Sequence, residues 1–285
     1  MILFKSAVDI NTYLTIKSKS GNKIGFIPTM GALHAGHLSL IENSKKSHFL
    51  TVASIFINPT QFNDPQDFAK YPVTLEKDIL ALEQSGCDIL FLPSAEEVYP
   101  NGTKLSPAFD IGYLETIFEG SYRSGHFQGV CQVMHRLLEI IMPATLFLGQ
   151  KDYQQCMVIR RLIVLNKWNI ELTVAPTFRE ESGLAMSSRN MLLTEPMKQK
   201  AAIIYHSLQY LKLQVKPGDL SIYTTKAEKM IREAGFEKID YVAIADADTL
   251  QSITEWNGQT PLVALVAAFL NGVRLIDNRL FISND

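Results

Sequence analysis

The chain has few cysteines, and their arrangement argues against two kinds of stabilising site. Cys87, Cys131 and Cys156 are the only cysteines among 285 residues, and they form no C-x-x-C pair. An odd number at such wide spacing argues against a disulfide framework and against a cysteine-rich zinc site. A protein that does not depend on disulfides fits a reducing compartment, so we expect a cytoplasmic protein.

The chain also lacks a segment suited to a membrane. Residues 1–6 have neither the apolar core nor the small-residue cleavage site of a signal peptide. The apolar run 262–270 is far shorter than the ~20 residues that span a bilayer. We therefore expect no membrane partner.

Charge of one sign is not in excess. The 27 basic and 29 acidic residues leave a formal net charge of −2. Nucleic acids and anionic membranes bind broad basic surfaces, which this composition does not favour. A small anionic ligand needs only a few local positive groups and is not excluded. Apolar residues make up 47% of the chain, enough for a core without disulfides or metals.

The first two-thirds of the chain alternates strand-like and helix-like segments. Short apolar and β-branched runs predict the strands, and apolar residues at helical spacing predict the helices. The predicted strands are 23–27, 49–57, 87–92, 145–148 and 171–174, and the predicted helices are 38–47, 74–85, 130–141 and 153–165. This alternation indicates a Rossmann-like α/β domain, in which helices cover both faces of a parallel sheet.

The pattern changes after about Pro176. Two predicted helices, 201–213 and 224–234, precede strand-like segments at 241–245, 262–269 and 273–276, as in a smaller α+β unit. We predict a ligand-binding domain at 1–177 and a C-terminal domain at 178–285, with a hinge near 176–183. The second domain would close over the first as a lid.

The sharpest motif, Pro28–His37 (PTMGALHAGH), directly follows the first predicted strand. Its glycines allow the backbone to pass close to a phosphate chain, and the following helix offers free N–H groups to the same anion. His34 and His37 could donate hydrogen bonds to phosphoryl oxygens as charge builds during displacement. They could also be two zinc ligands, but H-x-x-H without a third ligand is a weak zinc signal.

Further polar segments follow predicted strands, where parallel-sheet proteins bind ligands. Asn58–Phe62 (NPTQF) offers amides suited to hydroxyls and carboxylates, although Asn-Pro alone also predicts an ordinary turn. Lys151, in Gly149–Gln155 (GQKDYQQ), could reach phosphate oxygens as a point charge. The Met186–Asn190 segment has two hydroxyls and a guanidinium that could wrap a pyrophosphate, or it could cap a helix.

Asp78, on the predicted helix 74–85, is the candidate metal ligand. A carboxylate near a triphosphate can hold Mg²⁺, which prefers oxygen ligands. A single aspartate on an amphipathic helix is more often a solvated side chain.

The motifs contain groups that bind phosphate and no nucleophile–base pair. G-x-S-x-G is absent, and no cysteine stands beside a histidine in these loops. Such a site suits transfer at phosphorus, where the protein positions the reactants and stabilises charge. A substrate carboxylate can then serve as the nucleophile.

H-x-G-H after the first strand resembles the hallmark of the nucleotidyltransferase superfamily, and PTMGALHAGH, NPTQF and GQKDYQQ resemble the pantothenate synthetase family. The resemblance covers residues 26–193, and it implies that the domain 1–177 binds a nucleotide and pantoate. Pantoate would attack the α-phosphorus of ATP, accompanied by Mg²⁺, to give pantoyl adenylate and pyrophosphate. β-Alanine would then convert the adenylate to pantothenate and AMP. The resemblance also implies a homodimer.

The resemblance assigns roles to individual residues. It implies catalysis by His34, His37, Lys151, Ser187, Ser188 and Arg189, and pantoate binding by Met30, Gln61, Phe62 and Gln155. The residues implied in ATP binding are Pro28, Thr29, Met30, Gly31, His34, Gly36, His37, Gly149, Lys151, Asp152, Met186, Ser187, Ser188 and Arg189. It further implies a binding role for Arg123 and a metal contact for Asp78.

Three positions depart from the family pattern, and three other classes of protein stay open. Lys77 stands where the family often has a second acidic residue, Ser124 replaces a proline, and Ser182 stands where aspartate is common. The alternatives are another H-x-G-H nucleotidyltransferase that activates a different substrate, a nucleotide-binding sensor without turnover, and a zinc hydrolase that uses the two histidines.

Overall fold

The computed structural model describes residues 1–62, 68–69, 71–104 and 108–281, in two compact units. The first comprises Met1–Gln150 and Gln154–Pro176, and the second comprises Lys151–Tyr153 and Thr177–Asp285. The sequence placed the division after residue 177 and assigned residues 151–153 to the first domain. These three residues group instead with the second unit, because hydrogen bonds described below attach them to it.

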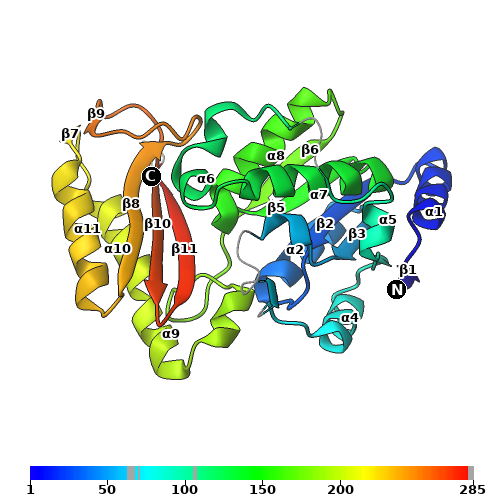
Figure 1. Ribbon diagram of the computed structural model, residues 1–285, viewed down its shortest axis with the longest axis horizontal. Coiled ribbons are helices and arrows are strands. Elements are labelled where there is room, and N and C mark those ends of the chain that lie inside the picture. Colours follow the sequence, from blue (N-terminus) through cyan, green and yellow to red (C-terminus); the bar gives the residue numbers. More distant parts are fainter. Residues whose placement is uncertain (63–67, 70, 105–107, 282–285) are drawn as a thin grey trace. The chain divides into compact units, whose positions relative to one another are not determined.

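A six-stranded parallel sheet is the framework of the first unit (Figure 1). Its strands are β1 (Ile2–Phe4), β2 (Ile24–Thr29), β3 (Leu50–Ile55), β4 (Ile89–Phe91), β5 (Thr145–Gly149) and β6 (Glu171–Ala175), in the order β1-β4-β3-β2-β5-β6. Strands β2, β3 and β4 are buried along almost their whole length, as strands covered on both faces should be. The predicted α/β parallel sheet is confirmed.

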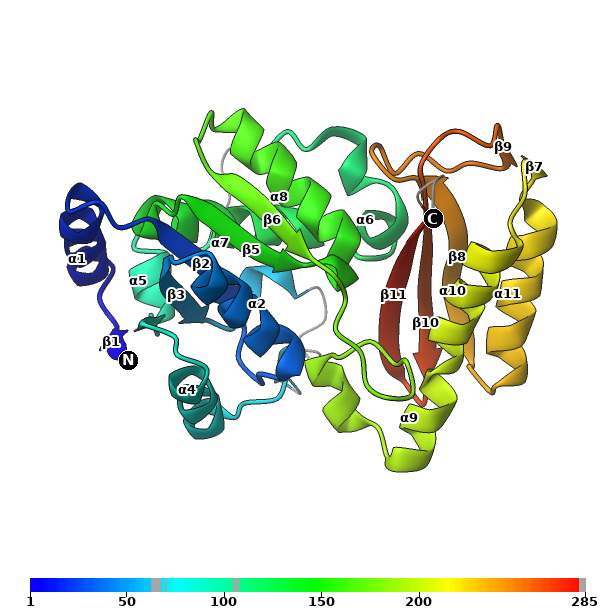
Figure 2. The same cartoon turned by 180° about the vertical axis from the view of Figure 1, so that it is seen from behind.

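Helices cover both faces of this sheet. They are α1 (Ala7–Lys19), α2 (Ala35–Lys46), α4 (Leu75–Gln84), α5 (Ala95–Val98), α6 (Phe118–Tyr122), α7 (His126–Ile141) and α8 (Tyr153–Leu165), with 3₁₀ turns η1 (Pro59–Gln61), η2 (Gly112–Glu115) and η3 (Gln150–Asp152). Helices α2 and α4 pack together, whereas α1 and α5 pack on α7. Figure 1 shows α7 in front of the sheet, and Figure 2, seen from behind, shows α2 in front.

The sequence prediction missed several parts of this unit, among them the short helices α5 and α6. Strand β1 and helix α1 were not predicted, because β1 has three residues and α1 buries only Ile10 and Leu14. Helix α7 begins at His126 rather than at Val130. Gly129 lies inside it, where a Cβ would come 2.1 Å from the carbonyl oxygen of Thr60, so the glycine lets α7 pack directly on η1.

The second unit is an α+β structure, as predicted. Strands β8 (Lys238–Asp246), β10 (Leu262–Leu270) and β11 (Val273–Phe281) form an antiparallel sheet in the order β11-β10-β8, and β7 (Gly218–Asp219) pairs with β9 (Glu255–Trp256). The helices are α9 (Glu195–Ala201), α10 (Ile203–Gln214) and α11 (Ser221–Glu233), preceded by the 3₁₀ turn η4 (Ser188–Leu192). The predicted helix 201–213 is thus interrupted at Ala202. Helices α10 and α11 pack on the sheet, and the apolar run 262–270 is its central strand.

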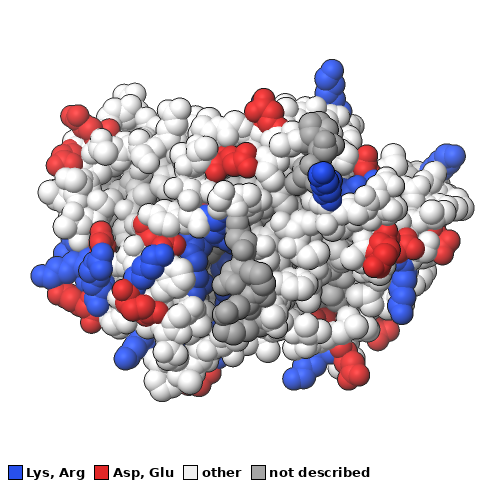
Figure 3. All heavy atoms as spheres, in the orientation of Figure 1, with Lys and Arg blue, Asp and Glu red and all other residues white. Residues whose placement is uncertain are grey.

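The described helices and the face shown in Figure 3 can be compared with the charge and hydropathy of the sequence. No helix in the described part of the chain is both long and apolar enough to cross a membrane. On the face shown in Figure 3, Lys and Arg side chains are interspersed with Asp and Glu side chains. Helix α11 carries the ion pairs Lys229 with Glu233 and Arg232 with Glu228.

Candidate active site

The turn after β2 lies where the strand order of the first unit reverses. From β2 the chain continues to β3 and β4 on one side, whereas β5 and β6 lie on the other. Parallel sheets bind ligands at such a switch point, beyond the carboxyl ends of the strands. In the described pairing, β2 meets β5 only at Gly25 and Phe26. Towards Thr29 and Gly149, β2 and β5 therefore no longer pair with each other, although β2 still pairs with β3 and β5 with β6.

His34 and His37 come together at the start of α2. Their ring centroids are 4.1 Å apart, and the backbone N–H of His34 donates to His37 Nδ1 over 3.4 Å. An accepting Nδ1 places the proton of a neutral imidazole on Nε2, so the N–H of a neutral His37 is at Nε2. Both histidines are partly exposed at the N-terminus of a 12-residue helix, which favours an anion there.

The carboxylate of Asp78 supports the turn before these histidines. Asp78 is only 3% exposed; its Oδ2 accepts the backbone N–H of Ala32 over 2.9 Å, and its Oδ1 accepts that of Leu33 over 2.8 Å. The Thr74 hydroxyl donates to the same carboxylate over 3.0 Å. The turn needs such support because Ala32 has a left-handed φ of +49°. Asp78 is therefore a buried turn support and not a solvated helix side chain.

A buried amide orients Gln61. Asn58 is 1% exposed, and its Nδ2 donates to Gln61 Oε1 over 3.2 Å and to the carbonyl of Gly129 over 3.1 Å. Its Oδ1 accepts from the Tyr99 hydroxyl over 2.8 Å. Burial raises the pKa of Tyr99 to about 12, so this hydroxyl stays protonated and donates. Because Asn58 binds the Gln61 oxygen, the Gln61 Nε2 is turned towards Met30 Sδ, 2.8 Å away.

Arg123 is connected to the same segment through a histidine. Arg123 Nη1 lies 3.0 Å from His126 Nε2, and His126 Nδ1 lies 2.7 Å from the Gln61 carbonyl oxygen. An arginine only donates, so His126 Nε2 accepts and Nδ1 carries the proton that it donates to Gln61. Arg123 also lies 3.8 Å from Glu119. His126 thus links the cationic side chain of Arg123 to the backbone of Gln61.

The two other residues predicted to bind pantoate have different surroundings. The ring of Phe62 packs edge-on against that of Tyr71, with centroids 5.8 Å apart. At the start of α8, Gln154 is buried and accepts the backbone N–H of Glu119 over 3.0 Å. Gln155 beside it is partly exposed, and its side chain makes no hydrogen bond with another described residue. Of the two amides, that of Gln154 is occupied by the backbone, and that of Gln155 is not bonded to another described residue.

In the second unit, Lys151 and Asp152 lie in a short turn that is fixed at two points. Asn278 Nδ2 donates to the Lys151 carbonyl over 2.8 Å, and the Tyr153 hydroxyl donates to the Ala247 carbonyl over 2.6 Å. The Lys151 side chain is 17% exposed, with Nζ 3.5 Å from Asp152 Oδ1. These bonds explain why residues 151–153 group with the second unit.

The other predicted phosphate-binding segment of the second unit follows a hairpin, residues 178–186. Ser187 caps η4, and its Oγ accepts the backbone N–H of Arg189 over 3.2 Å, so the helix-cap interpretation holds for this serine. Asn190, which follows Arg189, is buried and donates to Glu180 Oε1 over 2.9 Å. The residues that stay partly exposed are Met186, Ser187, Ser188 and Arg189.

The described side chains do not form a metal site by themselves. They include no group of three His, Cys, Asp or Glu residues that could hold a metal ion. A zinc hydrolase built on His34 and His37 would need a third protein ligand. Asp78 already accepts three hydrogen bonds from the turn and from Thr74. The residues therefore do not fit a Mg²⁺ ion held by the protein alone.

Sequence reasoning assigned no role to Tyr99 or His126, and it treated the Asn58 amide as a possible ligand contact; Asn58 and Tyr99 instead orient Gln61, and His126 holds Arg123. Asn58 and His126 stand inside the motifs, so motif membership was an available signal. Tyr99 is 41 residues from Asn58 and offered none. The structure does bring together His34 with His37 and Met30 with Gln61.

Comparisons with known proteins agree with one another. The sequence profile of the family described as pantoate-β-alanine ligase matches residues 3–280. A protein named pantothenate synthetase from Cytophaga hutchinsonii is 43% identical over 284 residues, which is 99% of this chain and 100% of that protein. A crystal structure of pantothenate synthetase from Thermus thermophilus is 35% identical, with a TM-score of 0.89 over 98% of this chain and 99% of that one. The pantoate-β-alanine ligase from Francisella tularensis, in a crystal structure complexed with β-γ ATP and β-alanine, is 36% identical, with a TM-score of 0.80 over 98% and 97%.

Proposed function

The chain belongs to the pantoate-β-alanine ligase family, and we propose on this basis that it condenses pantoate with β-alanine to form pantothenate, with ATP as the activating substrate. The observation that carries the proposal is the turn after β2. It starts at Met30, which Gln61 contacts, and ends at the paired rings of His34 and His37. A pantoate-binding amide and phosphate-binding donors thus belong to one short segment.

In the first step, a carboxylate oxygen of pantoate attacks the α-phosphorus of ATP. The bond from that phosphorus to the oxygen shared with the β-phosphate breaks, which gives pantoyl adenylate and pyrophosphate. The Nε2–H of His37 and the ring of His34 stabilise the charge that builds on the phosphoryl oxygens, together with the N-terminus of α2.

Gln61 orients the attacking acid. Its Nε2 donates to Met30 Sδ, and a thioether sulfur is a weak acceptor. A pantoate oxygen is a better partner for the same N–H, so pantoate would replace the sulfur without a rotation of the Gln61 amide. Gln155 supplies a second amide, and Met30 and Phe62 supply apolar contacts.

In the second step, the free amine of β-alanine attacks the acyl carbon of the adenylate. The amide bond forms, the amine loses a proton, and the bond from the acyl carbon to the phosphate oxygen breaks to release AMP. A site that excludes water protects the mixed anhydride from hydrolysis between the two steps.

The second unit contributes the remaining phosphate contacts and acts as a lid. Lys151, Ser187, Ser188 and Arg189 bind the phosphates, and Asp152 binds the ribose. The backbone around the nucleotide comes from Pro28, Thr29, Gly31, Gly36, Gly149 and Met186. Arg123 takes part in binding through its connection to Gln61.

Mg²⁺ enters this proposal as the counter-ion of ATP. Mg²⁺ usually binds substrate phosphates with few protein ligands and keeps several waters. The hydrogen bonds of Asp78 to the turn after β2 support this arrangement over a protein-held ion. Bound to ATP, the ion neutralises phosphate charge.

We further propose a cytoplasmic homodimer. The three cysteines are free and buried, which fits a reducing compartment. The dimer rests on the family resemblance, and light scattering should give a mass of about twice 32.0 kDa. A monomeric mass at working concentration would overturn that part of the proposal.

The function is tested by pyrophosphate release from ATP and Mg²⁺. Sustained release should require both pantoate and β-alanine, with AMP and pantothenate as products. Pantoate alone should give about one turnover, because the adenylate stays bound. Release that depends on another acid would indicate a different nucleotidyltransferase, and nucleotide binding without any release would indicate a sensor.

A further inference from the structure

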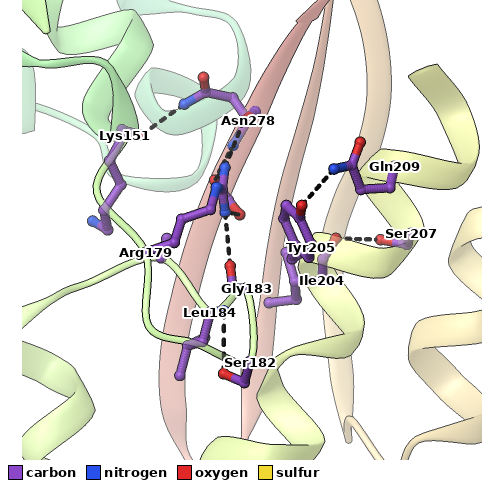
Figure 4. A network of polar contacts seen from close by, with 12 residues as sticks. Lys151, Arg179, Ser182, Gly183, Leu184, Ile204, Tyr205, Ser207, Gln209 and Asn278 are labelled. Atoms are coloured by element: carbon purple, nitrogen blue, oxygen red, sulfur yellow. Dashed lines mark hydrogen bonds and ion pairs between the residues drawn. The ribbon is translucent and has the colours of Figure 1, made fainter. Parts of the chain in front are cut away.

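Two neighbouring polar residues of β11 are buried in the second unit. Asp277 is 4% exposed and Asn278 is 2% exposed. Buried polar side chains cost free energy unless they are hydrogen-bonded, so their partners indicate what they hold in place. Figure 4 shows that Asn278 faces the Lys151 segment and that Arg179 lies between this strand and the hairpin at Gly183.

Asp277 fixes the hairpin 178–186 through Arg179. Arg179 Nη1 lies 2.6 Å from Asp277 Oδ2, and Nη2 lies 3.0 Å from Oδ1. The two residues, 98 apart in sequence, thus form a bidentate ion pair. Arg179 Nη1 also donates to the Gly183 carbonyl over 3.0 Å. The guanidinium lies 4.8 Å from the ring centroid of Tyr205, which covers it from α10. The hairpin leads directly into Ser187.

Asn278 fixes the other segment. Its Nδ2 donates to the backbone carbonyl of Lys151, so it holds the main chain and leaves the lysine side chain to contact a ligand. Its own backbone N–H donates to Asp277 Oδ1 over 2.7 Å. The two residues therefore form one connected support.

A structural role alone is a weak explanation of this support. Burial raises the pKa of the Asp277 carboxyl, and the adjoining Arg179 guanidinium opposes that rise. Replacing a buried ion pair by apolar side chains of similar volume often leaves stability unchanged or increases it. What the charged and amide groups provide here is a fixed position for two separate backbone segments.

We propose that Asn278 and Asp277 are positioning residues that hold the Lys151 segment and the hairpin before Ser187 on a common support. The inference rests on the proposed function, in which both segments bind the phosphates of ATP. It adds that two adjacent residues of β11 fix both segments within the second unit, each through its own hydrogen bonds. Neither Asn278 nor Asp277 contacts the substrate in this proposal.

The test uses hydrogen exchange of the full-length protein without any substrate. Asn278→Asp removes the N–H donor to Lys151 and should speed amide exchange of residues 151–153 about tenfold, the effect of losing one hydrogen bond. Arg179→Lys keeps the positive charge but loses the bidentate hydrogen bonds to Asp277. It should speed amide exchange in 178–190 and leave exchange in 151–153 unchanged. Slow amide exchange in the central strand 262–270 shows that a variant is folded. If this strand exchanges fast in Asn278→Asp, that variant is unfolded, and Asn278→Ser is measured in its place.

The matched control is Asn257→Asp. Among the described residues, Asn257 is bonded through its oxygen alone, which accepts the backbone N–H groups of Gln259 and Thr260, so an aspartate keeps both bonds. This variant adds the same charge to the same unit and should not change exchange in 151–153. Unchanged exchange of 151–153 in Asn278→Asp would overturn the proposed support.

Kinetics separate a positioning role from general destabilisation. In Asn278→Asp, the kcat/KM for ATP should fall about tenfold, while the KM for pantoate stays unchanged because its predicted contacts lie in the first unit. An equal loss for both substrates would contradict the positioning role. If the wild-type protein shows no pantoate-dependent turnover, the proposed function fails, but the exchange measurements still decide whether the support exists.

Discussion

The backbone N–H of Ala32 and the Oδ2 of Asp78 lie 2.9 Å apart, although 46 residues separate them. This bond joins α4 to the left-handed turn before His34 and His37. It makes Asp78 a determinant of histidine position, and it leads to a prediction that distinguishes turn support from metal binding.

Asp78→Asn should lower the rate of pantoate-dependent adenylation at least tenfold. An amide keeps one oxygen acceptor but turns its NH₂ group towards a backbone N–H, which leaves a buried donor unsatisfied at about 1–3 kcal/mol. The Mg²⁺ concentration for half-maximal rate should not change. Asp110→Asn is the control, because exposed Asp110 also accepts a backbone N–H, that of Gly112. A large rise in the Mg²⁺ requirement of Asp78→Asn would show that Asp78 binds the metal.

Asn58→Asp should weaken pantoate binding. The aspartate loses the N–H donors to Gln61 Oε1 and to the Gly129 carbonyl, so the Gln61 amide is no longer fixed with its Nε2 towards the position proposed for pantoate. We expect the KM for pantoate to rise about tenfold, the scale of one lost hydrogen bond, while the KM for ATP stays the same. Tyr99→Phe keeps the Asn58 donor and removes the hydroxyl that bonds Asn58 Oδ1 and Thr60, so it should give a smaller rise. An unchanged KM for pantoate in both variants would contradict the role assigned to Asn58.

Gly183→Ala should destabilise the protein by about 2–4 kcal/mol. Gly183 has φ +89°, and a Cβ there would lie 2.2 Å from the Tyr205 ring. Gly235→Ala is a matched control, since its φ of +92° gives similar backbone strain but a Cβ would meet no atom within 4 Å. That control should cost only about 1 kcal/mol. Equal losses in urea unfolding would mean that contact with Tyr205 contributes nothing.

The buried thiols should make stability depend on alkaline pH. Burial raises the pKa of Cys87 from 9.0 to about 11 and that of Cys131 to about 12. The unfolded chain releases these protons first, so the stabilising contribution is complete below pH 9 and is lost as the pH rises towards the folded pKa values. The difference in unfolding free energy between wild type and Cys87→Ala should therefore shrink between pH 8 and pH 10.5.

Thiol labelling gives an independent check of the same burial. At pH 8 the three native cysteines should react with a disulfide reagent only after denaturant is added, because all three are buried. Ser47→Cys, at an exposed position, should react within seconds and serves as the control. Fast labelling of Cys87 or Cys131 in the native protein would mean that the thiols are reached without unfolding.

The contiguous parts of the site were predictable, and the parts that orient them were not. The Pro28–His37 turn could be predicted because strand, glycine turn and helix follow one another in the chain. The sheet was predictable for the same reason, since each long strand and its helix carry their own apolar pattern. Three residues of β1 carry too little pattern to be recognised.

Supporting contacts join residues that are far apart in sequence. Asp78 could be placed on a helix, but nothing in its spacing indicated that the helix would turn the carboxylate into the β2 turn. The Arg179–Asp277 pair spans 98 residues, and each partner alone reads as an ordinary charged residue. Only the three-dimensional fold brings such groups together, so sequence patterns predict candidate binding residues and not the residues that support them.

The grouping of Lys151–Tyr153 with the second unit has a consequence for how this protein could be divided or recombined. The chain passes between the two units after Gln150, after Tyr153 and after Pro176. A gene fragment that stops at Pro176 would keep Lys151 but lose Asn278 and Ala247, which hold its segment. The second unit is therefore not an exchangeable module: a chimera that takes it from a relative must take these three residues from the middle of the first unit as well.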